Sequence, residues 1–438
     1  MNSIVLRPIL FFISLALVAC STSKKTTKSD SILNANIDTS AILSNGFAGL
    51  HVADLQTGQI LYSRNAQKYF APASNTKIFT LFACLSSLQD SIPAIKYVET
   101  DSTLTFWGTG DPTFMHPMFD QSRTLAFLTS KAASKKLFQS YAHSSIEPFG
   151  EGWMWDDYND YYQPELTSFP AYGNVLLIQK DSNGISAQPD FLMSRMVKNA
   201  NSKIVKRNPD QNLFQVPIAL DTAAIFEQEI PYKNAETVNR EILESLINAK
   251  INVSQQALPE NAQLLYSMPV DTVLRRMMQV SDNMLAEHLL LLSGMVNGDS
   301  ISSSFAINYI IDNYMKDISQ KPKWVDGSGL SRYNMMTPLM MTELLKKMYS
   351  QYPEKRLFSL MAVGGLNGTI KNLYKTEQEP YIFAKSGTLS GVYNLSGYLI
   401  AKSGRKLIFS FMNNNFIHPA SKTRKEVERT LILIRDMY

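Results

Sequence analysis

The chain has 438 residues, of which 45% are hydrophobic and 18% are charged, so it can bury a large core and build two or three domains. Its formal net charge is only +4, and Arg7 in the first nineteen residues supplies one of these charges. This balance excludes the strongly basic surface that nucleic-acid binding requires, so neither DNA nor RNA is expected as a partner.

The first twenty residues have the order of a secretory signal, with one positive charge at Arg7, an apolar run over residues 9–18, and then Ala19-Cys20. The run is too short to be a stable membrane span. Leu17-Val18-Ala19-Cys20 resembles the bacterial lipobox, which implies cleavage before Cys20 and lipidation of that residue. An ordinary signal followed by a chance cysteine is the alternative. We expect residues 1–19 to be a lipoprotein signal peptide, and the exported, periplasmic protein to be anchored to a membrane by acyl chains on Cys20.

Residues 20–40 are polar and aperiodic, which predicts a flexible tether, with folding expected to start near Ile42. The only other cysteine, Cys84, lies in the apolar run 78–85 and is expected to be a buried small hydrophobe rather than a reactive thiol. With Cys20 lipidated, no internal disulfide can form.

The folded part begins with a strand–turn–strand pattern, residues 47–54 and 59–63, which predicts a β-hairpin. Ala73-Ser74 then opens a predicted helix, whose apolar positions recur at helical spacing: Ile78, Leu81, Phe82, Leu85 and Leu88. From residue 91 to 265 the pattern changes to short strands and turns, with a Tyr/Trp-rich stretch at 153–162. The pattern over residues 91–265 predicts an insertion of one or two mixed α/β domains.

Residues 268–280 and 283–295 are predicted to be two helices broken at Ser281-Asp282. Three β-rich runs and a final helix close the chain, at 381–385, 392–401, 406–413 and about 422–438. We therefore expect one domain built from residues 41–90 and 266–438, interrupted by an insertion over residues 91–265.

Three short motifs follow one another along the chain: Ser74-Asn75-Thr76-Lys77, Ser281-Asp282-Asn283 and Lys385-Ser386-Gly387. Each alone is weak, because the first pattern also occurs by chance at Ser21–Lys24 and Ser403–Lys406. These two chance copies lie in the predicted tether and in a hairpin turn, where Ser, Gly and Lys are expected for conformational reasons. Read singly, each motif could also be an ordinary helix cap, turn or strand end, but their order and context together favour chemistry.

The first motif supplies a nucleophile and a base. Because Lys77 lies one helical turn after Ser74 on the same face, its amine can reach the serine hydroxyl. A serine needs such a base, and a lysine can serve when burial and a second cation, here Lys385, lower its pKa. Ser281 could relay a proton to the leaving amine, and the backbone N–H groups of Ser74 and Thr388 could form the oxyanion hole.

With these motifs and several longer stretches, the chain resembles the class C penicillin-binding proteins, the D-alanyl-D-alanine carboxypeptidase/endopeptidases. The resemblance extends from residue 47 to about 415 and includes Ala71–Lys77, Gly110–Thr113, Gly152–Asp157, Asp326–Arg332 and Lys385–Tyr393. The long gap from Lys77 to Ser281 also fits a family that inserts domains between its first two motifs. A class A β-lactamase has no room for such an insertion.

The resemblance implies an α+β/α/β architecture: a penicillin-binding (β-lactamase-like) transpeptidase domain with an antiparallel sheet flanked by helices, plus the mixed insertion. It implies that peptidoglycan peptides, and β-lactam antibiotics as inhibitors, acylate Ser74. Asn283 would contact the substrate amide, and Ser386, Gly387 and Thr388 would bind the terminal carboxylate. A pocket for the side chain of the third peptide residue would be formed by Trp153, Asp156, Tyr161, Arg332, Leu389 and Ser390. The family usually has threonine at the position of Ser386. The serine keeps the hydroxyl group and lacks only the methyl group.

The sequence therefore predicts a serine D-alanyl-D-alanine carboxypeptidase, with endopeptidase action left open. No metal or cofactor is expected, because the five histidines, at 51, 116, 143, 288 and 418, form no ligand pair of the H-E-x-x-H type. A non-catalytic peptidoglycan-binding lipoprotein of the same fold is the alternative. A β-lactam-hydrolysing enzyme would need a deacylating base that the sequence does not identify.

Overall fold

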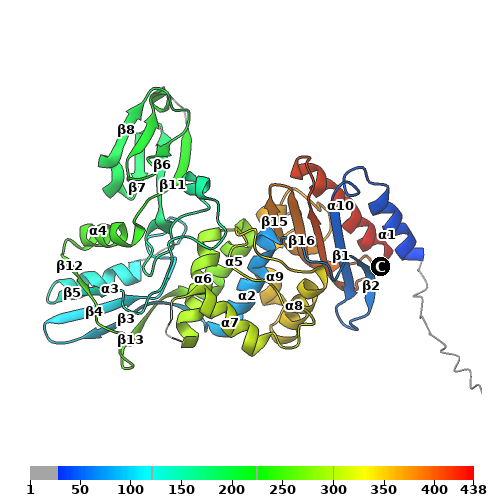
Figure 1. The fold of residues 1–438 in the computed structure, drawn as a ribbon, viewed down its shortest axis with the longest axis horizontal. Coiled ribbons are helices and arrows are strands. Elements are labelled where there is room, and N and C mark those ends of the chain that lie inside the picture. The colour runs from blue at the N-terminus through cyan, green and yellow to red at the C-terminus, as the bar shows by residue number, and fades with distance from the viewer. Residues whose placement is uncertain (1–27, 120–121, 223–224, 299) are drawn as a thin grey trace, which may run out of the picture.

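The structure is a computed structural model that describes residues 28–119, 122–222, 225–298 and 300–438. One end of the molecule is an antiparallel sheet with helices on both faces, and the other end is an insertion of smaller sheets, part of which projects away from the body (Figure 1). The predicted signal peptide, the lipobox and Cys20 lie outside the described residues.

The large sheet has the strand order β14-β15-β16-β17-β1-β2 and is antiparallel throughout. Its strands are β1 (Phe47–Asp54), β2 (Ile60–Arg64), β14 (Ala362–Val363), β15 (Ile382–Leu389), β16 (Val392–Ile400) and β17 (Lys406–Asn414). The predicted hairpin is confirmed as β1–β2, and the three predicted C-terminal strands are confirmed as β15–β17. Since β1 pairs with β17, the two ends of the chain close one sheet and the residues between them can carry an insertion.

Helices cover both faces of this sheet (Figure 1). One face packs against α1 (Lys28–Asp38) and α10 (Ala420–Met437). The other face packs against a helical layer made of α2 (Lys77–Ser87), α5 (Val270–Val280), α6 (Asn283–Gly298), α7 (Ser303–Tyr314), α8 (Pro338–Gln351) and α9 (Glu354–Leu360). The expected antiparallel sheet flanked by helices is confirmed.

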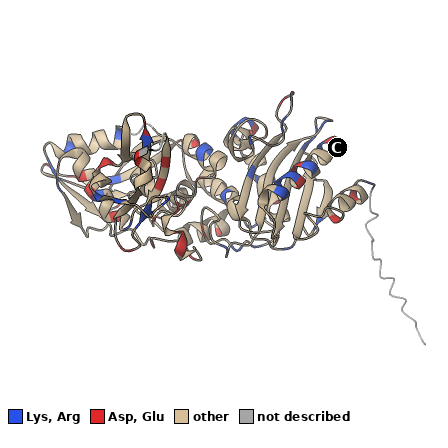
Figure 2. Cartoon of the chain, turned by 90° about the horizontal axis from the view of Figure 1, so that it is seen from above, with Lys and Arg blue, Asp and Glu red and all other residues tan. Residues whose placement is uncertain are grey.

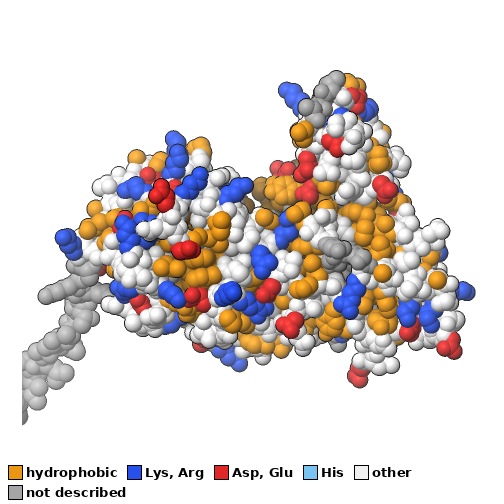
Figure 3. Space-filling model, turned by 180° about the vertical axis from the view of Figure 1, so that it is seen from behind, with side chains coloured by type: hydrophobic (Ala, Val, Ile, Leu, Met, Phe, Trp, Pro, Cys, Tyr) orange, Lys and Arg blue, Asp and Glu red, His pale blue; other side chains and the backbone are white. Residues whose placement is uncertain are grey.

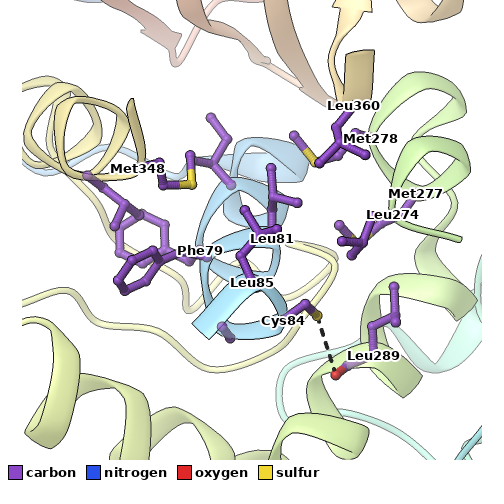
Figure 4. Close-up of a cluster of buried hydrophobic side chains, with 14 of the residues drawn as sticks. Phe79, Leu81, Cys84, Leu85, Leu274, Met277, Met278, Leu289, Met348 and Leu360 are labelled. Atoms are coloured by element: carbon purple, nitrogen blue, oxygen red, sulfur yellow. Dashed lines mark hydrogen bonds between the residues drawn. The ribbon is translucent and has the colours of Figure 1, made fainter. Parts of the chain in front are cut away.

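Helix α2 lies at the centre of the helical layer because its apolar side chains point in all directions. Phe79, Leu81 and Leu85 are surrounded by side chains of α5, α8 and α9 (Figure 4). Cys84 is buried in the same layer, with its Sγ 3.6 Å from the carbonyl oxygen of Leu289, and burial raises the pKa of its thiol to about 12. The prediction that Cys84 is buried is confirmed, and a raised thiol pKa disfavours the reactive thiolate.

The predicted tether was wrong for residues 28–38, which form helix α1. Leu33 and Ile37, one turn apart, are buried against α10, and Asn36 Nδ2 donates a hydrogen bond to Thr430 Oγ1 at 2.8 Å. Only two strongly apolar side chains face the core, so the polar residues around them hid the helix in the sequence. Contact with α10, far away in the chain, supplies the stability that local sequence lacks.

The insertion contains two units with separate hydrophobic cores. The first is a mixed sheet of order β12-β5-β4-β3-β13, packed against α3 (Ser122–Ala132) and α4 (Ala235–Ile247). Its strands are β3 (Ser91–Glu99), β4 (Thr103–Gly108), β5 (Lys136–Ser140), β12 (Ile251–Ser254) and β13 (Gln263–Pro269). Because β13 runs on to Pro269, which caps α5 in an extended conformation, the helix predicted from residue 268 begins at Val270.

The second unit of the insertion is the projecting part in Figure 1. It has two three-stranded sheets, of order β11-β6-β7 and β8-β10-β9. The strands are β6 (Val175–Asp181), β7 (Gly184–Gln188), β8 (Met196–Asn199), β9 (Lys206–Arg207), β10 (Phe214–Pro217) and β11 (Phe226–Pro231). The number of inserted units, open in the sequence, is two.

Positive and negative side chains are interspersed over both ends of the molecule (Figure 2). Within the described ranges, no helix combines the length and the apolar character needed to cross a bilayer.

Candidate active site

The first motif lies at the start of α2, at the centre of the molecule. Ser74 is in a 3-10 turn, η1 (Ala73–Thr76), and Lys77 is the first residue of α2. Lys77 is fully buried, and its Nζ lies 3.2 Å from Ser74 Oγ, 2.7 Å from Asn283 Oδ1 and 2.7 Å from the carbonyl oxygen of Ser328. Burial lowers the pKa of Lys77 to about 8. A neutral amine here can donate its two N–H groups to Asn283 and Ser328 and direct its lone pair at the Ser74 hydroxyl.

The second and third motifs meet on the other side of Ser74. Lys385 of β15 is fully buried, and its Nζ donates hydrogen bonds to Ser281 Oγ at 2.9 Å and to the carbonyl oxygen of Ser386 at 2.6 Å. Burial, together with the charge of Lys77, holds the pKa of Lys385 well below its usual value. The structure thus brings the two predicted cations and both predicted hydroxyl groups into one cluster.

The backbone at this cluster is strained and tightly packed. Ala73, directly before the nucleophile, has φ +48° and Ser281 has φ +67°, both in the left-handed region that residues with a Cβ seldom adopt. Gly387 allows β15 to approach η1 closely, since a Cβ there would lie 2.6 Å from the carbonyl oxygen of Pro72 and 2.9 Å from the nitrogen of Ser74. This packing places the β15 backbone beside the N–H of Ser74, as an oxyanion hole formed with Thr388 would need.

A cleft of about 580 Å³ opens at Ser74 between the peptidase domain and the insertion. Seen from behind, the surface has a notch between the projecting part of the molecule and the rest (Figure 3). Of the residues predicted from the sequence, the cleft is lined by Ser74, Tyr161, Ser281, Asn283, Thr388, Leu389 and Ser390. The insertion contributes His116, Tyr172 and Glu229. Asn283 also ties the two parts together, because its Nδ2 donates to the carbonyl oxygen of Tyr162 at 3.1 Å.

The remaining predicted pocket residues lie around the cleft rather than along it. Trp153 is half-buried and donates its indole N–H to Asp326, while Arg332 Nη2 donates to the carbonyl oxygen of Ser390 at 3.2 Å. Asp156 is exposed in the turn η2 (Trp155–Asn159), and its neighbour Asp157 lines the cleft. Partial burial raises the pKa of Asp157, against a hydrogen bond from Tyr162 that lowers it.

Two buried carboxylates near Lys77 were not predicted as site residues, although Asp326 opens one of the stretches that carry the family resemblance. Asp326 accepts four hydrogen bonds, from the backbone of Gly329 and Ser331 and from the side chains of Asn334 and Trp153. Glu287 accepts two, from the backbone of Gly327 and Ser328. Glu287 carried a signal in the sequence, since it is the single acidic residue in the run 284–292, which is apolar except for Glu287 and His288.

The predicted carboxylate-binding hydroxyl of Ser386 also has an unforeseen partner. Ser386 is buried beside the cluster, and its Oγ donates to Thr369 Oγ1 at 2.7 Å. Thr369 lies in a turn with no motif of its own, so nothing in the sequence connected it with the site.

Comparison with known proteins gives one consistent result. A family model described as the D-Ala-D-Ala carboxypeptidase 3 (S13) family matches residues 32–432. The D-alanyl-D-alanine carboxypeptidase DacB of Haemophilus influenzae is 26% identical over 420 residues, covering 83% of this chain and 85% of that protein. A D-alanyl-D-alanine carboxypeptidase of an Actinomadura species is 26% identical over 431 residues, covering 86% of this chain and 79% of that protein.

Solved structures give the same fold. The crystal structure of penicillin binding protein 4 (dacB) from Haemophilus influenzae matches with a TM-score of 0.71 and 19% identity, over 93% of this chain and 98% of that one. A second structure of that protein, in complex with a β-lactam, matches with a TM-score of 0.68 and 18% identity over the same shares of the two chains. The expected penicillin-binding architecture is confirmed.

Proposed function

The chain belongs to the D-Ala-D-Ala carboxypeptidase 3 (S13) family and is a serine-type D-Ala-D-Ala carboxypeptidase, and we propose that it acts on peptidoglycan stem peptides through an acyl-enzyme on Ser74. One observation carries the proposal. The Lys77 amine lies 3.2 Å from Ser74 Oγ, and two acceptors, Asn283 Oδ1 and the carbonyl oxygen of Ser328, hold its other hydrogens.

In the acylation step, Ser74 Oγ attacks the carbonyl carbon of the penultimate D-alanine and gives its proton to Lys77. The carbonyl oxygen becomes an oxyanion, which accepts hydrogen bonds from the backbone N–H groups of Ser74 and Thr388. The C–N bond then breaks. The departing amine takes a proton from the Ser281 hydroxyl, which Lys385 reprotonates across the 2.9 Å hydrogen bond that joins them.

In the deacylation step, water attacks the ester carbon and gives a proton, through the Ser281 hydroxyl, to the Lys385 amine left neutral by acylation. The bond to Ser74 Oγ then breaks, and Lys77 returns to the serine oxygen the proton that it took in acylation. The terminal carboxylate of the substrate would lie near Lys385 and the Ser386 hydroxyl, since both are positive or proton-donating groups beside Ser281. A β-lactam would form the same ester but would keep its leaving group attached, so inhibition is expected. The β-lactam complex of the Haemophilus influenzae protein supports this.

Two further points belong to the proposal. We propose that crosslinked peptides are cleaved as well, since the cleft is lined from both the peptidase domain and the insertion and extends beyond the hydroxyl cluster. We also propose export and lipid anchoring through Cys20, on the lipobox sequence alone.

The proposal is tested by intact-mass analysis after incubation with benzylpenicillin. We expect one penicilloyl group per chain, on the peptide that contains Ser74, and none in Ser74→Ala. A chain that gains no mass, or gains it on Ser281, would refute the acyl-enzyme and favour a peptidoglycan-binding protein without this chemistry.

A further inference from the structure

Glu287 is a buried acid that touches none of the reacting groups directly. It lies on α6 one turn after Asn283, so both side chains lie on the helix face toward α2. Its side chain is almost fully buried, and its two oxygens accept hydrogen bonds from consecutive backbone N–H groups, Gly327 at 2.9 Å and Ser328 at 2.7 Å. A buried carboxylate is costly, so its retention beside the nucleophile needs a reason.

The peptide that Glu287 holds leads directly to the base. Ser328, whose N–H is bound by Glu287, accepts one hydrogen of Lys77 Nζ at its carbonyl oxygen, at 2.7 Å. On the same segment, Thr80 Oγ1 donates to the carbonyl oxygen of Gly327 at 2.6 Å. There is no room for adjustment, since a Cβ on Gly327 would lie 2.5 Å from the carbonyl oxygen of Ala286. Moving the Glu287 carboxylate would therefore move an acceptor of the Lys77 amine.

We propose that Glu287 is a positioning residue of the reaction: it fixes the Ser328 carbonyl that orients the Lys77 amine, and its charge acts on the proton of that amine. The inference rests on the proposed role of Lys77 as the base. It adds a residue that fixes where the lone pair of this base points.

The charged groups around Lys77 determine the sign of the charge effect. Glu287, Asp326 and Asp282 favour the ammonium form of Lys77, and Glu287 is the strongest of the three, whereas burial favours the neutral amine. Lys385 opposes the ammonium form, as its own pKa shift from Lys77 shows. Burial and the charge of Asp326 raise the pKa of Glu287 itself to about 8, so its carboxylate is ionised over only part of the range in which Lys77 titrates. Removing this charge should still lower the pKa of Lys77, so that the neutral base forms at lower pH.

Two substitutions of Glu287 separate the effect of its charge from the effect of the position of its carboxylate. Glu287→Gln removes the charge and turns an N–H₂ group toward a backbone N–H, so it loses one of the two hydrogen bonds. Glu287→Asp keeps the charge but shortens the side chain by one methylene. Glu236→Gln is the matched control, because Glu236 is a half-buried glutamate that also accepts two hydrogen bonds, from the N–H and the hydroxyl of Ser168, but lies in the insertion.

The first measurement is an NMR titration of protein labelled with ¹³C at the lysine Cε, with the Lys77 signal identified by its loss in Lys77→Met. We expect the Lys77 midpoint of Glu287→Gln to fall by about half a pH unit, because Glu287 is only partly ionised near that midpoint, and those of Glu287→Asp and Glu236→Gln to stay at the wild-type value. An unchanged midpoint in Glu287→Gln would overturn the inference. This readout needs no catalysis, so it stands apart from any failure of the acyl-enzyme proposal.

The second measurement is the rate of acylation by a fluorescent penicillin at a pH above the Lys77 midpoint. We expect both Glu287 variants to be slower by at least about tenfold, with an unchanged affinity for the unreacted drug, because Glu287 does not contact it. Thermal unfolding identifies folded variants. Folded Glu287→Gln and Glu287→Asp that acylate at the wild-type rate would overturn the positioning role.

Discussion

The indole Nε1 of Trp153 donates a hydrogen bond to Oδ2 of Asp326 at 3.0 Å and so joins the insertion to the segment that orients the base. Asp326 is buried, and its other acceptor positions bind the backbone of Gly329 and Ser331. Gly329 follows Ser328, whose carbonyl oxygen holds Lys77. A residue expected to line the substrate pocket therefore also supports the catalytic centre from behind.

Replacing this indole tests the support. Trp153→Phe keeps an aromatic ring but removes the donor, leaving a buried carboxylate with one partner fewer. We expect the free energy of unfolding to fall by about 1–3 kcal/mol, measured by urea denaturation. Trp155→Phe in the same turn is the control, because that side chain is 85% exposed and its loss should change stability by less than about 0.5 kcal/mol. Equal losses in the two variants would mean that the Trp153–Asp326 hydrogen bond adds no stability.

The lowered pKa of Lys77 predicts how acylation depends on pH. The amine is protonated below its pKa of about 8 and becomes a base above it. The acylation rate with a fluorescent penicillin should therefore rise about tenfold per pH unit at acidic pH and level off above about 8. A rate that is constant from pH 6 to 9 would contradict a base with this pKa.

Replacing Lys77 tests its role as the base independently of any pH dependence. Lys77→Met is uncharged and nearly equal in length, so it fills the buried space while eliminating the lone pair. We expect acylation to fall by at least about a thousandfold, with the circular dichroism spectrum unchanged. Lys68→Met, an exposed lysine on the loop before η1, is the control and should acylate normally. Acylation of Lys77→Met at the wild-type rate would show that another group takes the serine proton.

The sequence predicted the peptidase domain well because its strands and helices have strong apolar periodicity. Strands β16 and β17 were placed to within about one residue at each end, and α5 and α6 were separated at Ser281 as predicted. Helix α1 was missed because contact with α10, and not its own composition, makes it stable. The three motifs were expected to meet, and the structure brings them together. Glu287 stands out in the sequence as an acid in a mostly apolar run, but its role was not predicted because its partners are backbone N–H groups, which have no sequence signature.

The lipid anchor is tested by Cys20→Ala. Without the cysteine, signal processing at this site and acylation should both fail, so the protein should leave the membrane fraction or accumulate with its signal peptide. Fractionation combined with labelling by a palmitate analogue distinguishes these forms. Cys84→Ala is the control, since that thiol is buried and should not affect labelling. Label retained in Cys20→Ala would rule out Cys20 as the lipidated residue.

The sharpest test of substrate specificity concerns Asp156, at the exposed rim of the cleft. Within the described residues, its side chain makes no hydrogen bond or ion pair, and Trp155 and Tyr161 near it in the chain are 85% and 62% exposed. An unpaired carboxylate near aromatic rings can bind an incoming ammonium group without breaking another contact. The third residue of a peptidoglycan stem presents such a group when it is a diamino acid. Since this contact is remote from the scissile bond, its binding energy can position the substrate.

Asp156→Ala should therefore lower kcat/KM by about a hundredfold, or about 2.7 kcal/mol, for stems with a free third-residue amine. The same variant should change little with stems whose amine is acetylated, or in its rate of penicillin acylation. Asp157→Ala is the matched comparison, because Asp157 is the neighbouring carboxylate and lines the cleft. If only Asp157→Ala loses the preference for the free amine, Asp157 is the binding carboxylate. If Asp156→Ala slows all three reactions equally, Asp156 stabilises the turn and does not bind the third-residue amine. A contact with that amine can affect only the substrate that carries it.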